Sequence, residues 1–190
     1  MKSCLILLIL LITTTTGFSQ EKLEREYRIK QCKVPLKALE FMRESFGSIG
    51  MKWYGEENLN GKNIEAKIKH NGMLFSVKFD TSGILQDVEM VVNYNTLPET
   101  TRATIEKQLV LLFSKYRIQK TQIQWLGNPK VLSSLIKRVN IQERHVVNYE
   151  ITLEGRKESR TEYFEFLFNE SGEVIRQSKI IQRNNHNLIY

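Results

Sequence analysis

Apolar and polar residues alternate with a period of two along several stretches of the chain, which is typical of strands with one buried face. Residues 63–70, "NIEAKIKH", alternate cleanly, and residues 73–80, "MLFSVKFD", do so again. Asn71-Gly72 between them favours a tight hairpin turn, because both residues accept a positive φ. The pattern predicts this hairpin, a short strand before it over 51–57 and another strand after it over 84–94.

Apolar residues recur at helical spacing in three other segments. "VPLKALEFMRESFG" over 34–47 and "LPETTRATIEKQLVLLFSKY" over 97–116 each open on an apolar residue followed by proline. Proline suits the start of a helix, where its missing N–H costs nothing. We predict a helix in each of these segments and a short extra helix within 128–145.

The second half of the chain returns to alternation. It predicts strands over 121–127, 146–155, 161–169 and 173–181. The connection "EGRKESR" at 154–160 is charged, and we expect it to be a long surface loop.

The sequence motif "FDTSG" at 79–83 recurs as "FNESG" at 168–172, 89 residues further on. In each, an inward Phe ends a strand and a Gly lets the chain reverse. The recurrence predicts an α+β fold of two tandem α-β-β-β-β repeats, over 34–95 and 96–182, the second with an insertion at 128–145. Each repeat would form an antiparallel sheet with helices packed on one face, joined either as one continuous sheet or as two packed subdomains.

The two ends of the chain differ from its middle. Residues 1–20 combine a positive charge, nine consecutive apolar residues and small residues near the end, the pattern of a secretory signal peptide. The apolar run is about half of the ~20 residues that a spanning helix needs, so a retained anchor is the weaker alternative. A charged lead-in at 21–33 and a polar tail at 183–190 flank the folded part. We expect a periplasmic or secreted protein without a transmembrane segment after cleavage.

The chain is basic: 28 Lys and Arg residues against 21 Asp and Glu residues give a net charge of +7, or +6 without Lys2. Such a surplus could attract acidic partners, but the basic residues are scattered and an exported protein rarely meets nucleic acid. We expect no nucleic-acid partner. Cys32 alone survives cleavage, so no internal disulfide is expected, and we expect Cys32 to be partly buried.

The order of these features resembles the PepSY-like proteins, exported tandem-repeat proteins of Gram-negative bacteria that are related in shape to β-lactamase inhibitor proteins. The resemblance covers most of the mature chain and is strongest over 34–92. The residues that carry it are Pro35, Trp53, Glu56, Ala66, Gly72, Phe75, Val77, Phe79, Asp80 and Gly83, then Pro98, Trp125, Tyr149, Phe164, Phe166, Phe168 and Gly172.

The resemblance implies a binding or inhibitory module of the cell envelope, with no catalytic site and no cofactor, whose partner is a protein or another envelope component. Its motifs mostly determine the fold, so fold transfers better than function. No specific target follows from it.

Three aromatic residues, Trp53, Tyr54 and Trp125, lie at the starts of predicted strands and are the candidate partner-binding residues. Trp and Tyr make good interface anchors on an open sheet face. The alternative is that both tryptophans close the core between helices and sheet, since Trp is highly buried on average.

Two other functions remain as alternatives to binding. Glu56 and Glu57 adjoin Trp53 and Tyr54, and a carboxylate pair beside aromatics would fit a hydrolase acting on an envelope polymer. Solvated charge at a strand end explains the pair more simply. A lipid-handling role would require a dry cavity between helix and sheet. The histidines do not lie at metal-ligand spacing, and we expect no metal.

Overall fold

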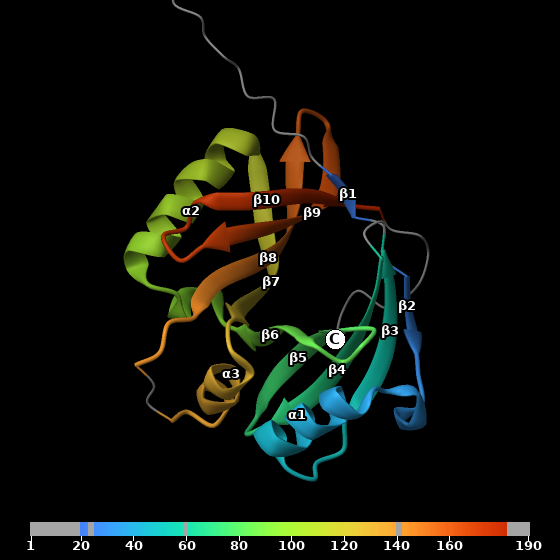
Figure 1. The fold of residues 1–190 in the computed structure, drawn as a ribbon. Helices are drawn as coiled ribbons and strands as arrows, with labels where there is room; N and C mark the ends of the chain where they lie inside the picture. The colour runs from blue at the N-terminus through green and yellow to red at the C-terminus, as the bar shows by residue number, and fades with distance from the viewer. Residues whose placement is uncertain (1–19, 23–24, 59–60, 140–141, 182–190) are drawn as a thin grey trace, which may run out of the picture.

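The computed structural model describes residues 20–22, 25–58, 61–139 and 142–181 (Figure 1). Its helices are α1 (Leu36–Phe46), α2 (Glu99–Leu112) and α3 (Pro129–Ile136), with short 3-10 turns η1 (Gln31–Lys33) and η2 (Tyr94–Thr96). Its strands are β1 (Gln20–Lys22), β2 (Arg25–Arg28), β3 (Lys52–Asn58), β4 (Gly61–His70), β5 (Met73–Asp80), β6 (Leu85–Val92), β7 (Lys115–Leu126), β8 (Val146–Lys157), β9 (Arg160–Asn169) and β10 (Val174–Ile180).

All ten described strands belong to one sheet, in the order β1-β10-β9-β8-β7-β6-β5-β4-β3-β2. Strands β2 to β10 pair antiparallel with their neighbours, and β1 pairs parallel with β10. The expected hairpin turn is confirmed: Asn71 and Gly72 both have positive φ, and His70 pairs directly with Met73.

Helices cover one face of this sheet. A row of paired residues on that face crosses six strands, namely Trp53, Ala66, Val77, Val88, Trp125 and Val147. Helices α1 and α3 pack over β3 to β6 and form the first apolar cluster, with Met42, Phe79 and Leu132 fully buried. Helix α2 packs over β8 and β9 and forms the second cluster, around Ile105 and Phe166. The α+β class is consistent with this architecture.

The prediction of two tandem α-β-β-β-β repeats is wrong. Backbone pairing continues without a break from β6 to β7, so of the two expected arrangements the chain forms one continuous sheet and not two packed subdomains. Helix α3 and Trp125, which come from the second half of the chain, pack into the first cluster. The physical reason is that the apolar side chains of α3 are buried in the same core as those of α1, so the first half of the chain does not form a core of its own.

The two recurring sequence motifs, at 79–83 and 168–172, do form similar local turns. Asp80 Oδ1 accepts hydrogen bonds from the backbone N–H groups of Ser82 and Ile84, both at 2.8 Å. Asn169 Oδ1 accepts one from the N–H of Glu173 at the same distance. Gly83 and Gly172 both adopt positive φ, +84° and +86°. Local sequence therefore dictates the turns, although it does not dictate two separate units.

Two boundaries differ from the sequence prediction, and a third element agrees with it. Helix α2 ends at Leu112 rather than at 116, because the following residues pair with β8 as the long strand β7. Residues 154–160 are not a long loop: Lys157 pairs with Arg160 across a two-residue turn. The short extra helix within 128–145 is confirmed as α3.

The expected lead-in at 21–33 is partly strand, since it contains β2 at one edge of the sheet, and Cys32 is exposed rather than partly buried. The predicted signal peptide, apart from Gln20 in β1, and the predicted tail at 183–190 lie outside the described residues. Within the described residues, no helix has the length and apolar character to span a bilayer.

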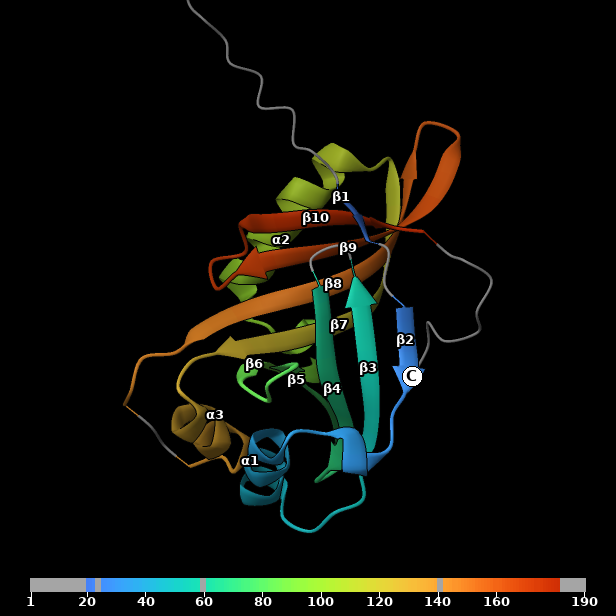
Figure 2. The same cartoon turned by 45° about the vertical axis from the view of Figure 1, so that its right-hand side comes forward.

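The sheet curls strongly. Strands β1 and β2 lie at its opposite edges, yet only two residues separate them in sequence. The Cα atoms of Lys22 and Arg25 can therefore be no more than about 11 Å apart. Figures 1 and 2 show the consequence: β3 and β4 run at a steep angle to β8, β9 and β10, and β1 and β2 extend along the two edges.

Candidate functional site

The face of the sheet opposite the helices carries charged and amide side chains instead of apolar ones. Six carboxylates from five neighbouring or nearby strands lie on it, and we call them and their surroundings the acidic face. They are Glu56 (β3), Glu65 (β4), Asp87 and Glu89 (β6), Glu150 (β8) and Glu165 (β9). Strand β7 contributes Gln122 and Gln124 between β6 and β8.

The acidic face is largely hidden from solvent. Asp87 is 9% exposed, Glu89 8% and Gln122 only 2%. The apolar clusters formed with α1, α2 and α3 lie on the other side of the sheet. Curling of the sheet toward its acidic face explains this burial. Carboxylates are rarely buried in proteins unless they are paired, so the pairing of each one matters.

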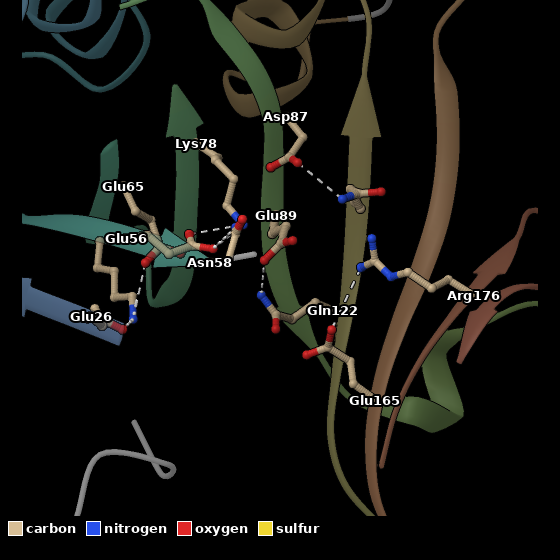
Figure 3. A network of polar contacts seen from close by, with 12 residues as sticks. Glu26, Glu56, Asn58, Glu65, Lys78, Asp87, Glu89, Gln122, Glu165 and Arg176 are labelled. Atoms are coloured by element: carbon tan, nitrogen blue, oxygen red, sulfur yellow. Dashed lines mark hydrogen bonds and ion pairs between the residues drawn. The ribbon is translucent and has the colours of Figure 1, made fainter. Parts of the chain in front are cut away.

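Among the described residues, Lys78, Lys67 and Arg176 neutralise part of this charge (Figure 3). Lys78 Nζ lies 3.1 Å from Glu56 Oε2, and the Asn58 amide donates to the same carboxylate at 3.4 Å. Lys67 Nζ lies 3.2 Å from Glu65 and 2.8 Å from Glu26 of the edge strand β2. Arg176 of β10 lies 3.8 Å from Glu165.

Asp87 and Glu89, in the middle of the face, have amide partners. Gln122 Nε2 donates to Glu89 Oε2 at 2.7 Å, and Gln124 Nε2 donates to Asp87 Oδ2 at 3.2 Å. Asn148 Nδ2 in turn donates to Gln124 Oε1 at 3.1 Å. Asp87, Gln124 and Asn148 are thus linked across β6, β7 and β8, and Glu89 and Gln122 form a second link between β6 and β7.

Burial changes the acidity of both central carboxyls. Burial raises the pKa of Asp87 to about 6, although the Lys78 ammonium opposes this and Glu150 adds to it. Burial, followed by repulsion from Glu150 and Asp87, raises the pKa of Glu89 well above its ordinary value. Strongly shifted carboxyls in one place are a marker of functional sites. These two carboxyls therefore retain protons at higher pH than ordinary carboxyls do.

The candidate hydrolase pair is not brought together. Glu56 and Glu57 are consecutive in β3, so their side chains point to opposite faces of the sheet. Glu56 is buried beside Lys78, whereas Glu57 pairs with Lys62 at 2.8 Å near the edge strand. The two carboxylates therefore do not face one substrate from one side.

The three aromatic candidates lie on both faces. Trp53 is 3% exposed within the first apolar cluster, and Trp125 is partly buried and packs against that cluster. Tyr54 lies on the other face, where the Arg28 guanidinium and the Lys67 ammonium lie 5.0 and 4.9 Å from its ring centre. Of the three, Tyr54 alone borders the acidic face.

Comparison with known proteins shows the fold. No family model and no curated protein matches the chain. A DUF2874 family protein from Bacteroides ovatus is similar in structure, with 9% identity over 77% of this chain and 87% of that chain and a TM-score of 0.50. A DUF2874 family protein from Bacteroides uniformis has 16% identity over 77% and 89%, also with a TM-score of 0.50. A protein from Bacteroides eggerthii, named only provisionally as periplasmic, has 15% identity over 77% and 88% and a TM-score of 0.49.

The sequence prediction did not single out the central residues of the acidic face. Asp87 and Glu89 sit in a segment correctly predicted as a strand, at alternate positions that a pattern assigns to a solvated face. A signal was present, because the outward positions in the middle of β6 and at the end of β7 are carboxyls and amides, namely Asp87, Glu89, Gln122 and Gln124. What the pattern could not show is that curling hides them from water.

Proposed function

We propose that this chain is an exported, non-enzymatic binding protein of the bacterial cell envelope and that the acidic face holds its partner. One observation carries the proposal: a chain with a net charge of +7 gathers six carboxylates on one buried face of its sheet. Charge separation of this kind costs stability and so favours a functional explanation.

The cost is concentrated at Asp87 and Glu89. A buried carboxylate without a full complement of partners is expensive, and like charges beside it add to the cost. A polar face that only needed to be compatible with folding could carry Thr, Ser or paired charges. A partner that brings positive charge would compensate these carboxylates.

Export and the absence of catalysis rest on the sequence. The N-terminal segment has the features of a signal peptide. The resemblance to PepSY-like proteins implies a binding or inhibitory module without cofactor or catalytic site. The position of Glu56 and Glu57 on opposite faces removes the specific support for the hydrolase alternative.

The proposal is tested by capture from the envelope followed by direct binding. The full sequence is expressed so that it is exported, and the protein is recovered with the components that it retains. We expect an identified component to bind the native protein and the Glu44→Gln control, because Glu44 is exposed on α1. The same component, once purified, should lose affinity for the Asp87→Asn, Glu89→Gln double variant. If no retained component distinguishes the double variant from the control, the acidic face is not the binding surface.

A further inference from the structure

The amide of Gln122 is incompletely satisfied. Its Nε2 donates to Glu89, but its Oε1 atom is buried and accepts no hydrogen bond. Gln122 is 2% exposed, so this oxygen is largely withheld from bulk water. An unpaired buried acceptor typically costs about 1–3 kcal/mol. Native structures contain few such atoms, and each calls for an explanation.

Turning the amide over does not remove the problem. In the other orientation a protonated Glu89 could donate to Oε1, but Nε2 would then lose its partner. In either orientation, Glu89 can pair with only one of the two polar groups of the Gln122 amide, the Nε2 donor or the Oε1 acceptor. The missing partner must come from elsewhere.

The surroundings define the chemistry of that partner. Gln122 pairs directly with Glu150 across β7 and β8 and bonds to Glu89 of β6, so its amide lies between two carboxyl-bearing strands. Figure 3 shows it between Glu89 and Glu165. A positively charged donor satisfies an amide oxygen and neighbouring carboxylates together, since it supplies both the hydrogen bond and the opposite charge.

The number and placement of the hydrogen-bond acceptors indicate which kind of positively charged group suits the site. Among the residues that the structure describes, no three carboxyl, His or Cys side chains are placed as ligands of one metal ion. An alkylammonium is a compact charge with three donors and suits acceptors from three adjacent strands. Asp87 and Glu89 keep 9% and 8% exposure, so the centre of the face is still reached from solvent.

We propose that the acidic face seats an alkylammonium group, such as a lysine side chain of the partner, which donates to Gln122 Oε1 and lies beside Glu89. This inference rests on the proposed function and names the chemistry that the partner must present. It also explains why a basic protein concentrates carboxylates here.

Proton binding competes with the cation. The charged and titratable groups that face Asp87 and Glu89 from the neighbouring strands are Lys78 of β5, Glu65 of β4, Glu56 of β3 and Glu150 of β8. Most are carboxyls, and they favour protonation of the central pair at low pH. Ionisation of Asp87 as pH rises through about 6, its pKa, strengthens cation binding.

The test uses two probes that differ only in the ammonium: Nα-acetyl-lysine methylamide and Nα-acetyl-norleucine methylamide. Each is titrated into the isotope-labelled native protein and followed by NMR. We expect the lysine probe to shift the side-chain amide signals of Gln122 and Gln124, and the norleucine probe to leave them in place. By proton linkage, affinity for the lysine probe should rise at least about tenfold from pH 5 to pH 7.5.

Two variants and a control locate the site. Glu89→Gln and Gln122→Met should each weaken the lysine probe by roughly tenfold, the effect of losing a charge-assisted hydrogen bond. Glu44→Gln, with the same charge change on the exposed side of α1, should not. The native-protein pH series does not depend on whether the variants fold.

Equal shifts from both probes, no shift from the lysine probe, or affinity independent of pH would overturn the inference. Its failure is distinguishable from failure of the proposed function. If a partner needs the acidic face but the lysine probe does not bind, the proposed function holds and the alkylammonium inference is wrong. If the lysine probe binds at Gln122 but no envelope component is retained, the alkylammonium inference holds and the proposed function is not supported.

Discussion

Asp87 lies at the centre of the acidic face, where burial and neighbouring carboxyls oppose its ionisation and the Lys78 ammonium favours it. Its hydrogen bond from Gln124 positions the carboxyl but brings no full positive charge. Folding therefore disfavours the ionised form of the Asp87 carboxyl, which is the form that it takes in water near neutral pH. That cost is measurable as a dependence of stability on pH.

We predict that Asp87→Asn stabilises the protein at pH 8. The folded-state pKa of Asp87, about 6, lies above the unfolded value near 3.9, so its contribution favours folding below about pH 4 and is lost as pH rises to 6. Asn stays neutral and escapes that loss. Urea unfolding should show a gain of about 1–3 kcal/mol at pH 8 and little difference at pH 4.

Glu44→Gln is the matched control for this measurement, because it removes an exposed carboxylate from α1 and should change stability by less than about 0.5 kcal/mol at either pH. An Asp87→Asn protein less stable than the native one at pH 8 would mean that Lys78 compensates the carboxylate fully.

Gly172 shows a second kind of constraint, a turn pressed against a helix. Its φ is +86°, and a Cβ placed on it would lie 2.5 Å from the backbone oxygen of Thr101 in α2. Gly72 has a similar φ of +80° but open space around it. The two glycines therefore separate the cost of backbone conformation from the cost of a clash.

We predict that Gly172→Ala destabilises the protein by about 3 kcal/mol or more and Gly72→Ala by only about 1–2 kcal/mol. The smaller figure is the penalty for a side chain in the left-handed region, and the clash adds the rest. Thermal and urea unfolding of the two variants would measure the difference. Equal losses would show that the turn and α2 move apart without cost.

Helix α3 is the short extra helix that the sequence predicted within the insertion at 128–145. It buries Val131, Leu132 and Ile136, and Leu132 is fully buried in the first apolar cluster with residues of α1. Since these residues come from the second half of the chain, α3 completes a core begun by the first half. Packing explains the helix without a partner.

We predict that Leu132→Ala lowers the free energy of unfolding by about 2–5 kcal/mol, the usual cost of truncating a fully buried leucine. Val139→Ala, beyond the end of α3 and 56% exposed, should cost less than about 0.5 kcal/mol. Urea denaturation of both variants would check this. A small loss at Leu132 would mean that α3 is only loosely attached.

Element types were predicted better than their ends. The strands over 63–70 and 73–80 and the turn between them follow from alternation and Asn-Gly, and the structure confirms them. The helix expected over 97–116 ends early because β7 pairs with β8 as far as Lys115 and Arg156. The expected loop at 154–160 is strand for the same reason: long-range pairing outweighs local polarity.

For the molecule as a whole, the continuous sheet predicts a single cooperative unfolding transition. Both tryptophans report on the first cluster, since Trp53 belongs to it and Trp125 packs against it. Their fluorescence should change at the same urea concentration as far-ultraviolet circular dichroism, which reports on all strands and helices. Leu132→Ala should shift both curves together. Two separate transitions would show that the halves unfold independently despite the β6–β7 pairing.

The acidic face exists only at the level of the curled sheet. Its residues come from strands between β3 and β10, and no short segment contains more than two of its six carboxylates. Each strand alone looks like an ordinary half-solvated strand. Proximity arises when these strands pair side by side, and burial arises because the sheet curls.

Period-two and helical patterns, Asn-Gly and the two glycine turns were enough to place most helices and strands, because these depend on local backbone preference and on which side chains avoid water. The merging of both halves into one sheet, the insertion of α3 into the first cluster and the burial of Asp87, Glu89 and Gln122 depend on contacts between residues far apart in the chain. Such contacts leave no periodic signal in the sequence. The alternation of apolar and polar residues therefore indicates a solvated face for these three residues, whereas the folded sheet keeps them from water.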